Sequence, residues 1–173
     1  MDLRYPIGRA ELAKSLDAGR RQQAIDSIAM VPRLLRGAVR GMTDTQLDTP
    51  YRPDGWTVRQ VVHHIPDSHM NAYIRFKLAL TEEAPPIKPY DEAAWARLED
   101  SRTTPIETSL VLLESLHDRW VRVLRAMSEA DFARTLTHPE RGEMTLDEML
   151  CLYEWHGKHH LAHIVSLAER SGW

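Results

Sequence analysis

Apolar residues recur at spacings of three and four along most of this chain, which is the period of an amphipathic helix. The pattern predicts four long helices, at about residues 18–42, 57–82, 105–127 and 145–171. No repeat or long linker divides the sequence, so residues 1–173 are expected to form a single domain. The expected fold is all-α, with a four-helix bundle as its architecture.

The links between these helices carry proline, glycine and other turn-forming residues. Two short helical turns are expected within them, at Asp91–Asp100 and at Ser128–Ala133. Residues 135–145 can form a small hairpin around the sequence Glu-Arg-Gly, in place of an irregular link. Pro32 is expected to bend the first long helix, because it lacks the backbone N–H that a helix interior needs.

Three segments begin with a threonine that is followed three residues later by glutamate or glutamine, the signature of a capping box. They are Thr57–Gln60, Thr104–Glu107 and Thr145–Glu148. In such a box each side chain accepts a hydrogen bond from a backbone N–H that the first helical turn leaves free. The boxes therefore predict where the second, third and fourth long helices begin.

Four of the nine histidines lie within two turns of the last predicted helix: His156, His159, His160 and His163. Residues four apart share one helix face, with Cβ atoms about 5–6 Å apart, so two imidazoles can bind one divalent ion. The pair His156 and His160 continues the apolar stripe of this helix and is expected to point into the core. His159 and His163 lie on the adjacent flank and are kept as substitute ligands.

The second predicted helix supplies a candidate third ligand. Of the adjacent His63 and His64, only one is expected to face the interior. His64 shares a polar stripe with Ser68, Asn71 and Arg75, and such a stripe either faces solvent or lines a cavity. Alone, His64 is more typical of a surface or hydrogen-bonded core histidine, and the second histidine cluster is what favours a ligand.

The sequence identifies the candidate general acids and bases less clearly than it identifies the candidate metal ligands. A metalloprotease-like helix would carry a glutamate after its first histidine, whereas this chain has Gly157 there. Asp67, one turn beyond His64, is a candidate for acid/base catalysis or for bonding the ligand's other ring N–H, and its alternative is an exposed carboxylate. His117 lies on the apolar stripe of the third helix. It is either a second acid/base candidate or a core histidine bonded to Asp67 or Tyr153.

Composition and charge exclude some classes of partner. The net charge of −3 and the pI near 6.3 provide no basic field for nucleic acid. The single cysteine, Cys151, cannot form an intramolecular disulfide, which suits a reducing compartment. No segment is typical of a signal peptide or a membrane span. We expect a soluble, cytoplasmic protein that binds neither nucleic acid nor membrane.

The segment from Gly55 to Leu78, Gly-Trp-Thr-Val-Arg-Gln-Val-Val-His-His and onward, together with Tyr153 to Ile164, resembles the YfiT subgroup of the DinB superfamily. The similarity extends over essentially the whole chain. The resemblance implies a four-helix bundle, a homodimer, and one zinc or nickel ion per subunit held by three histidines. It also implies a metal-dependent hydrolase.

Position by position, the family's first ligand falls on His64, eight residues after Trp56, and its His-x-x-x-His pair falls on His156 and His160. Both assignments agree with the helix-face argument. Pro66 departs from the pattern, because a residue compatible with the helix interior is expected there.

Three neutral imidazoles leave a coordination position for water, as catalytic zinc sites do. The expected function is therefore hydrolysis of an unknown small molecule, with zinc as the first choice of metal and nickel as the second. One alternative is an S-transferase that uses a low-molecular-weight thiol of the bacillithiol or mycothiol type. The other is a non-catalytic metal-binding stress protein, which a fourth ligand from His117 or His159 would favour.

Overall fold

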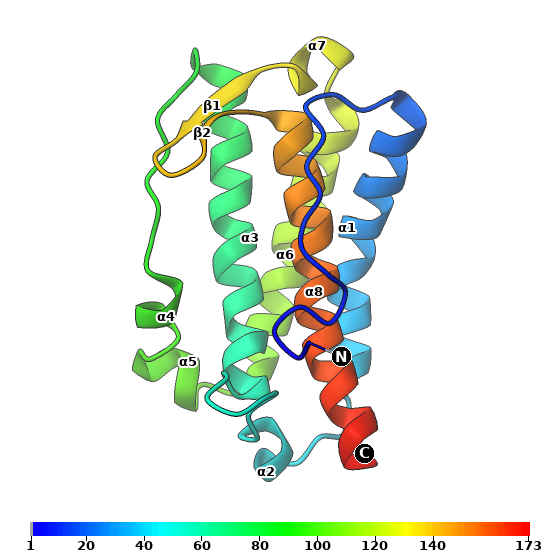
Figure 1. The fold of residues 1–173 in the computed structure, drawn as a ribbon, viewed down its shortest axis with the longest axis vertical. Coiled ribbons are helices and arrows are strands. Elements are labelled where there is room, and N and C mark those ends of the chain that lie inside the picture. Colours follow the sequence, from blue (N-terminus) through cyan, green and yellow to red (C-terminus); the bar gives the residue numbers. More distant parts are fainter. Residues whose placement is uncertain (1) are drawn as a thin grey trace.

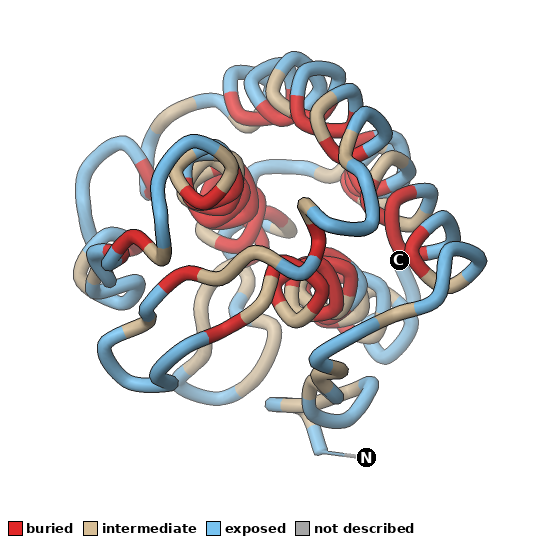
Figure 2. The backbone as a smooth tube through the Cα atoms, turned by 90° about the horizontal axis from the view of Figure 1, so that it is seen from above, coloured by how far each residue is buried: buried red, intermediate tan, exposed pale blue. Residues whose placement is uncertain are grey.

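The computed structural model describes residues 2–173 and contains a bundle of four long helices (Figure 1). They are α1 (Ala18–Ala38), α3 (Val58–Thr81), α6 (Ile106–Ala126) and α8 (Leu146–Ser171). Both α1 and α3 pack against α6 and α8, so the four helices close into a ring. Buried residues lie on the inward sides of the helices (Figure 2). The predicted all-α four-helix bundle is confirmed.

The links carry the short elements that the sequence predicts and two that it does not: the helix at Asp44–Leu47, and the helix at Glu99–Thr103, which runs past the turn expected at Asp91–Asp100. The short elements are α2 (Asp44–Leu47), α4 (Glu92–Trp95), α5 (Glu99–Thr103), α7 (Glu129–Phe132), β1 (Thr135–His138) and β2 (Gly142–Thr145). The antiparallel pairing of β1 with β2 confirms the hairpin. The unpredicted α2 begins with a capping box of its own, between Thr43 and Gln46, so the same sequence signal marks it.

Two of the three predicted capping boxes form. Thr57 and Thr145 each accept a hydrogen bond from the backbone three residues on and receive the reciprocal bond. The box at Thr104 is wrong, because α6 begins at Ile106 without a side-chain cap. The Glu107 carboxylate instead accepts hydrogen bonds from the Arg36 guanidinium on α1, at 2.8 and 3.0 Å.

Prolines lie inside α1 and α3, and both helices continue through them. Pro32 has no N–H for the Ile28 carbonyl, and Pro66 has none for the Val62 carbonyl. The freed carbonyl of Ile28 accepts a hydrogen bond from His117 instead.

The apolar core falls into two clusters, one toward each end of the bundle. One is built around Phe76, Trp120 and Leu150, and the other around Ile65 and Ile164. On α3, α6 and α8 the stretch between the two clusters carries histidine, so polar rings lie in the middle of the bundle. Within residues 2–173, no helix is long and apolar enough to cross a membrane.

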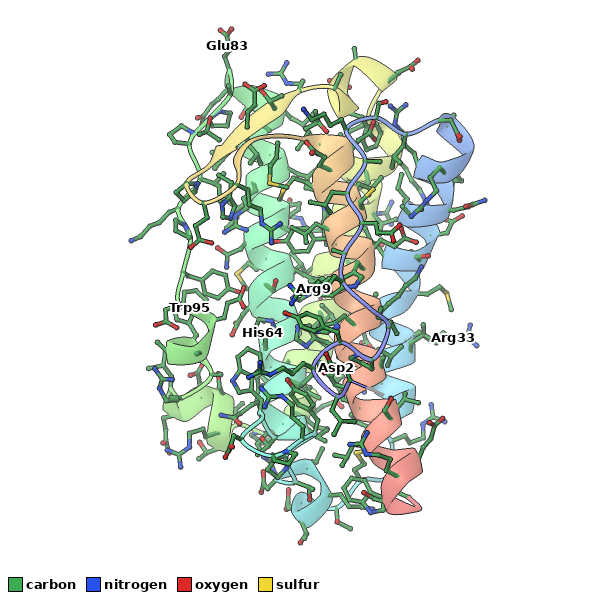
Figure 3. The ribbon with its side chains drawn as sticks, viewed as in Figure 1. Asp2, Arg9, Arg33, His64, Glu83 and Trp95 are labelled. Atoms are coloured by element: carbon green, nitrogen blue, oxygen red, sulfur yellow. The ribbon has the colours of Figure 1, made fainter. Side chains whose placement is uncertain are left out.

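The segment that precedes α1 runs along the outside of α8 (Figure 1). Its Gly8 carbonyl accepts a hydrogen bond from Trp155 Nε1 at 3.0 Å, and the Leu16 amide donates to Asp147 at 2.9 Å. Arg9, on the same segment, lies in front of α8 in Figure 3. The segment therefore covers the helix that supplies most of the clustered histidines.

Candidate metal centre

Three histidines from two facing helices converge in the bundle: His64 from α3, and His156 and His160 from α8. One ligand nitrogen from each lies within 4.8 Å of the other two. The Nε2 atoms of His64 and His156 are 3.2 Å apart. Two nitrogens bound tetrahedrally to zinc at about 2.0–2.1 Å lie about 3.3 Å apart, so this pair fits a metal ion. His64 is labelled in Figure 3.

These three rings are held in their neutral form, which is the form that binds metal. Burial lowers the pKa of His64 to about 4, and the neighbouring His159 lowers it further. Burial, followed by repulsion from the neighbouring imidazoles, lowers the pKa values of His156 and His160 well below the ordinary range. The buried Nδ1 of His160 has no hydrogen-bond partner among residues 2–173.

Among residues 2–173, no carboxylate, cysteine or further histidine joins this group of three. Neither His117 nor His159 therefore belongs to this group of three. His160 is shared with a second group, formed with His159 and His163.

The rings of this second group are packed against aromatic side chains. His163 stacks on Tyr51 with ring centroids 3.9 Å apart, and His159 stacks on Trp155 at 4.2 Å. His163 also donates a hydrogen bond through Nε2 to the Arg4 carbonyl, at 3.2 Å. His159 and His163 are thus buried, on a flank that the N-terminal segment covers.

His63 and His64 are both buried, so the expectation that only one would face the interior is wrong. The two rings face different neighbours. His63 donates through Nε2 to the Thr104 carbonyl at 3.0 Å and accepts at Nδ1 from the Ser109 hydroxyl at 2.7 Å. His63 thereby ties α3 to the start of α6, while His64 faces α8.

His117 is a hydrogen-bonded core histidine, but its partners are neither Asp67 nor Tyr153. Its Nε2 lies 2.8 Å from Nδ1 of His69, and its Nδ1 lies 2.9 Å from the Ile28 carbonyl oxygen. His69 is a buried residue beside the site for which the sequence patterns predicted no role. A signal was available, because His69 continues the buried stripe of Ile65, Ala72 and Phe76 on α3.

Asp67 is half-buried on α3 and is not part of the histidine group. Burial raises the pKa of its carboxyl to about 6, and repulsion from Asp100 contributes. A carboxyl with this pKa can hold or release a proton near neutral pH. Its role in acid/base chemistry stays a prediction, as does that of His117.

A cavity of about 650 Å³ lies beside the centre. His160, His159 and His163 line it together with Trp56, whose ring lies 4.7 Å from that of His64. Its lining also includes the cationic side chains of Arg4, Arg52 and Arg97, against one carboxylate, that of Asp54. The cavity can therefore hold a small molecule, and its charge favours an acidic one.

Comparison with known proteins adds family relationships to this geometry. Residues 27–164 match the family model described as the DinB superfamily. The chain is 52% identical over 174 residues to a Bacillus subtilis protein named "Putative metal-dependent hydrolase YfiT", covering 100% of this chain and 98% of that one. A similarly named Bacillus mycoides protein is 52% identical over 172 residues, covering 99% of each chain.

A solved structure shows the same fold. It is described as YfiT from Bacillus subtilis, "a probable metal-dependent hydrolase with an unusual four-helix bundle topology". The two structures superpose with a TM-score of 0.97 at 51% identity, over 100% of this chain and 99% of the other. The fold and the family resemblance are thus confirmed over the whole length.

Proposed function

This chain belongs to the DinB superfamily, and from that premise we propose that it is a metal-dependent hydrolase whose metal is held by His64, His156 and His160. The observation that supports this most directly is the approach of two neutral Nε2 atoms to 3.2 Å, with His160 beside them. Zinc is the proposed metal and nickel the alternative, since imidazole binds both. One ion is proposed for each subunit.

The chain's own residues would bind and orient the substrate. When bound, the metal would supply Lewis acidity, which activates water and polarises a carbonyl group. Arg4, Arg52 and Arg97 would attract an acidic group into the cavity, and Trp56 would exclude water from one side of the centre. Asp67 is the proposed proton carrier, because its raised pKa of about 6 allows it to change protonation near neutrality.

Metal analysis of purified variants tests the ligand set. We expect about one metal ion per chain in the wild type and a loss of stoichiometric metal in His64→Ala, His156→Ala and His160→Ala. The matched control is His138→Ala, which removes a histidine from the hairpin, outside both histidine groups. Full metal content in all three ligand variants would contradict the assignment.

A low-molecular-weight thiol is the alternative co-substrate, because the arginines of the cavity would suit a thiol that carries a carboxylate group. The metal-loaded protein should be given ester and amide libraries, and separately a thiol with electrophilic acceptors. Hydrolysis without thiol supports the proposal, whereas turnover only with thiol would make the protein an S-transferase. A metal-loaded protein that is inactive in both assays would favour a non-catalytic binding role. The homodimer and the cytoplasmic location stay predictions.

A further inference from the structure

Three imidazoles and one carbonyl form a continuous chain of hydrogen bonds behind the candidate metal centre. The Ile28 carbonyl oxygen lies 2.9 Å from His117 Nδ1, and His117 Nε2 lies 2.8 Å from His69 Nδ1. His69 Nε2 in turn lies 3.0 Å from His156 Nδ1. Each long helix contributes one member: α1, α6, α3 and α8 in that order. We call this set the imidazole chain.

The imidazole chain ends at a carbonyl, that of Ile28, which Pro32 leaves without its helical hydrogen-bond donor. In a regular helix, the Ile28 carbonyl would accept from the N–H of residue 32. Residue 32 is Pro32, which has no N–H, so this buried carbonyl needs another donor. His117 Nδ1 supplies it. The proline inside α1 thus creates the acceptor on which the chain ends.

This carbonyl sets the direction of every hydrogen bond in the chain. A carbonyl only accepts, so the proton of His117 must be on Nδ1. A neutral imidazole carries one N–H, so His117 Nε2 must accept from His69 Nδ1, and His69 Nε2 must accept from His156 Nδ1. Three contacts need three protons, and three neutral rings carry three.

The rings are buried in a way that keeps them neutral. Burial lowers the pKa of His117 to about 4. His69 and His117 are almost completely buried, with 0% and 3% of their surface exposed. Water therefore offers no competing hydrogen-bond partner that would move the proton of either imidazole to its other nitrogen.

We propose that His69 and His117 are positioning residues that hold His156 in its Nδ1–H form, with the Nε2 lone pair directed toward the metal. This inference rests on the proposed function for the metal itself. A hydrogen bond from the far side of a ligating imidazole fixes its orientation and raises its basicity. Loss of such a partner typically weakens metal binding by about 10–100-fold.

The same geometry argues that the imidazole chain does not conduct protons. Its far end is the Ile28 carbonyl, which neither takes up nor releases a proton at neutral pH. A proton passed from His156 would have no group to leave through. His117 therefore acts through His69 and His156, and does not act as an acid or base on substrate.

The first test uses the metal-free wild-type protein. Long-range nitrogen–proton NMR correlations distinguish the two neutral forms of each histidine ring. At pH 7.5 we expect His117, His69 and His156 all to carry their proton on Nδ1. A proton on Nε2 of His156 would overturn the proposal, and this measurement needs no variant.

The second test compares two replacements of His69 by zinc affinity, measured in competition with a chelator. His69→Leu removes the acceptor, and we expect zinc binding about 10–100-fold weaker. His69→Gln should recover most of the affinity, because its amide oxygen can accept from His156 and its amide N–H can donate to His117. His117→Leu should weaken zinc binding less than His69→Leu, because His69 still reaches His156.

A matched control separates positioning from a general loss of packing. His63→Leu removes another buried histidine of α3 that makes two hydrogen bonds, and we expect its zinc affinity to match the wild type. Equal zinc affinity in His69→Leu and the wild type would overturn the proposal, as would equal weakening in the leucine and glutamine variants. If the wild type does not bind zinc, the proposed metal centre is wrong, and the proposed positioning role of the imidazole chain is wrong with it.

Discussion

At the scale of single residues, Asp67 couples folding stability to pH. Burial raises the pKa of its carboxyl to about 6 from an ordinary 3.8, so the folded protein holds this proton more tightly than the unfolded chain does. The stabilising contribution is complete below about pH 4 and is lost as the pH rises through 6. At pH 8 the folded protein bears the cost of a partly buried charge, about 1 kcal/mol once solvent screening is allowed for.

Asp67→Asn should therefore be more stable than the wild type at pH 8 and equal to it at pH 4. Urea unfolding at the two pH values measures the difference. Asp118→Asn, at an exposed position of α6, reports the effect of removing one surface charge. A stability difference that is the same at both pH values would contradict the prediction.

The residues of the site differ in how far the sequence predicts them. His156 and His160 are predicted by their spacing on a single helix, and this local relation survives folding. The partners of His117 are not predictable in this way, because they depend on how far α3 and α6 are shifted along each other. The wrong expectation for His63 and His64 has the same origin, since α3 packs against α6, α8 and α5 and so has more than one buried face.

At the scale of helices, the contact between α1 and α8 depends on Gly157, which lies between two predicted metal ligands. A Cβ atom at this position would lie 2.6 Å from Cγ2 of Val31. Gly157→Ala should lower the free energy of unfolding by about 1–2 kcal/mol, because overpacking exceeds the gain in helix propensity. Displacement of α8 should also weaken metal binding.

Gly37→Ala is the matched control, since nothing lies within 4 Å of a Cβ there. It should stabilise α1 by up to about 1 kcal/mol. Combining Gly157→Ala with Val31→Ala should recover part of the loss in stability and in metal binding. If the double variant loses as much free energy of unfolding as the two single variants added together, the steric explanation is wrong.

Helix boundaries are well predicted where the cap is local. Thr57 and Thr145 find their partners three residues away, and both boxes form. The box at Thr104 fails because Pro105 has a ψ of 132°, outside the helical range, so α6 begins one residue later, and Glu107 pairs with Arg36, 71 residues away in the chain. A cation that is distant in the sequence can thus bind the side chain that would otherwise cap the helix, and the local sequence pattern does not predict this.

At the scale of the whole molecule, one carboxylate joins the N-terminal segment, α1 and α8. Asp147 is 1% exposed and accepts two hydrogen bonds of 2.8 Å from the Arg21 guanidinium. It also accepts from the Leu16 amide at 2.9 Å. Its place in the first turn of α8 adds a favourable interaction with the helix dipole.

Asp147→Ala should lower the free energy of unfolding by about 3–5 kcal/mol, because it leaves the charge of Arg21 buried without a partner. Asp118→Ala removes the exposed pair with Arg122 and should cost less than about 0.5 kcal/mol. Urea unfolding measures both, and hydrogen exchange should show faster opening at Leu16 in the Asp147 variant. Equal losses in the two variants would mean that Asp147 acts as an ordinary surface carboxylate. A large loss confined to Asp147→Ala, with faster exchange at Leu16, would show that this carboxylate holds the N-terminal segment and α1 to α8.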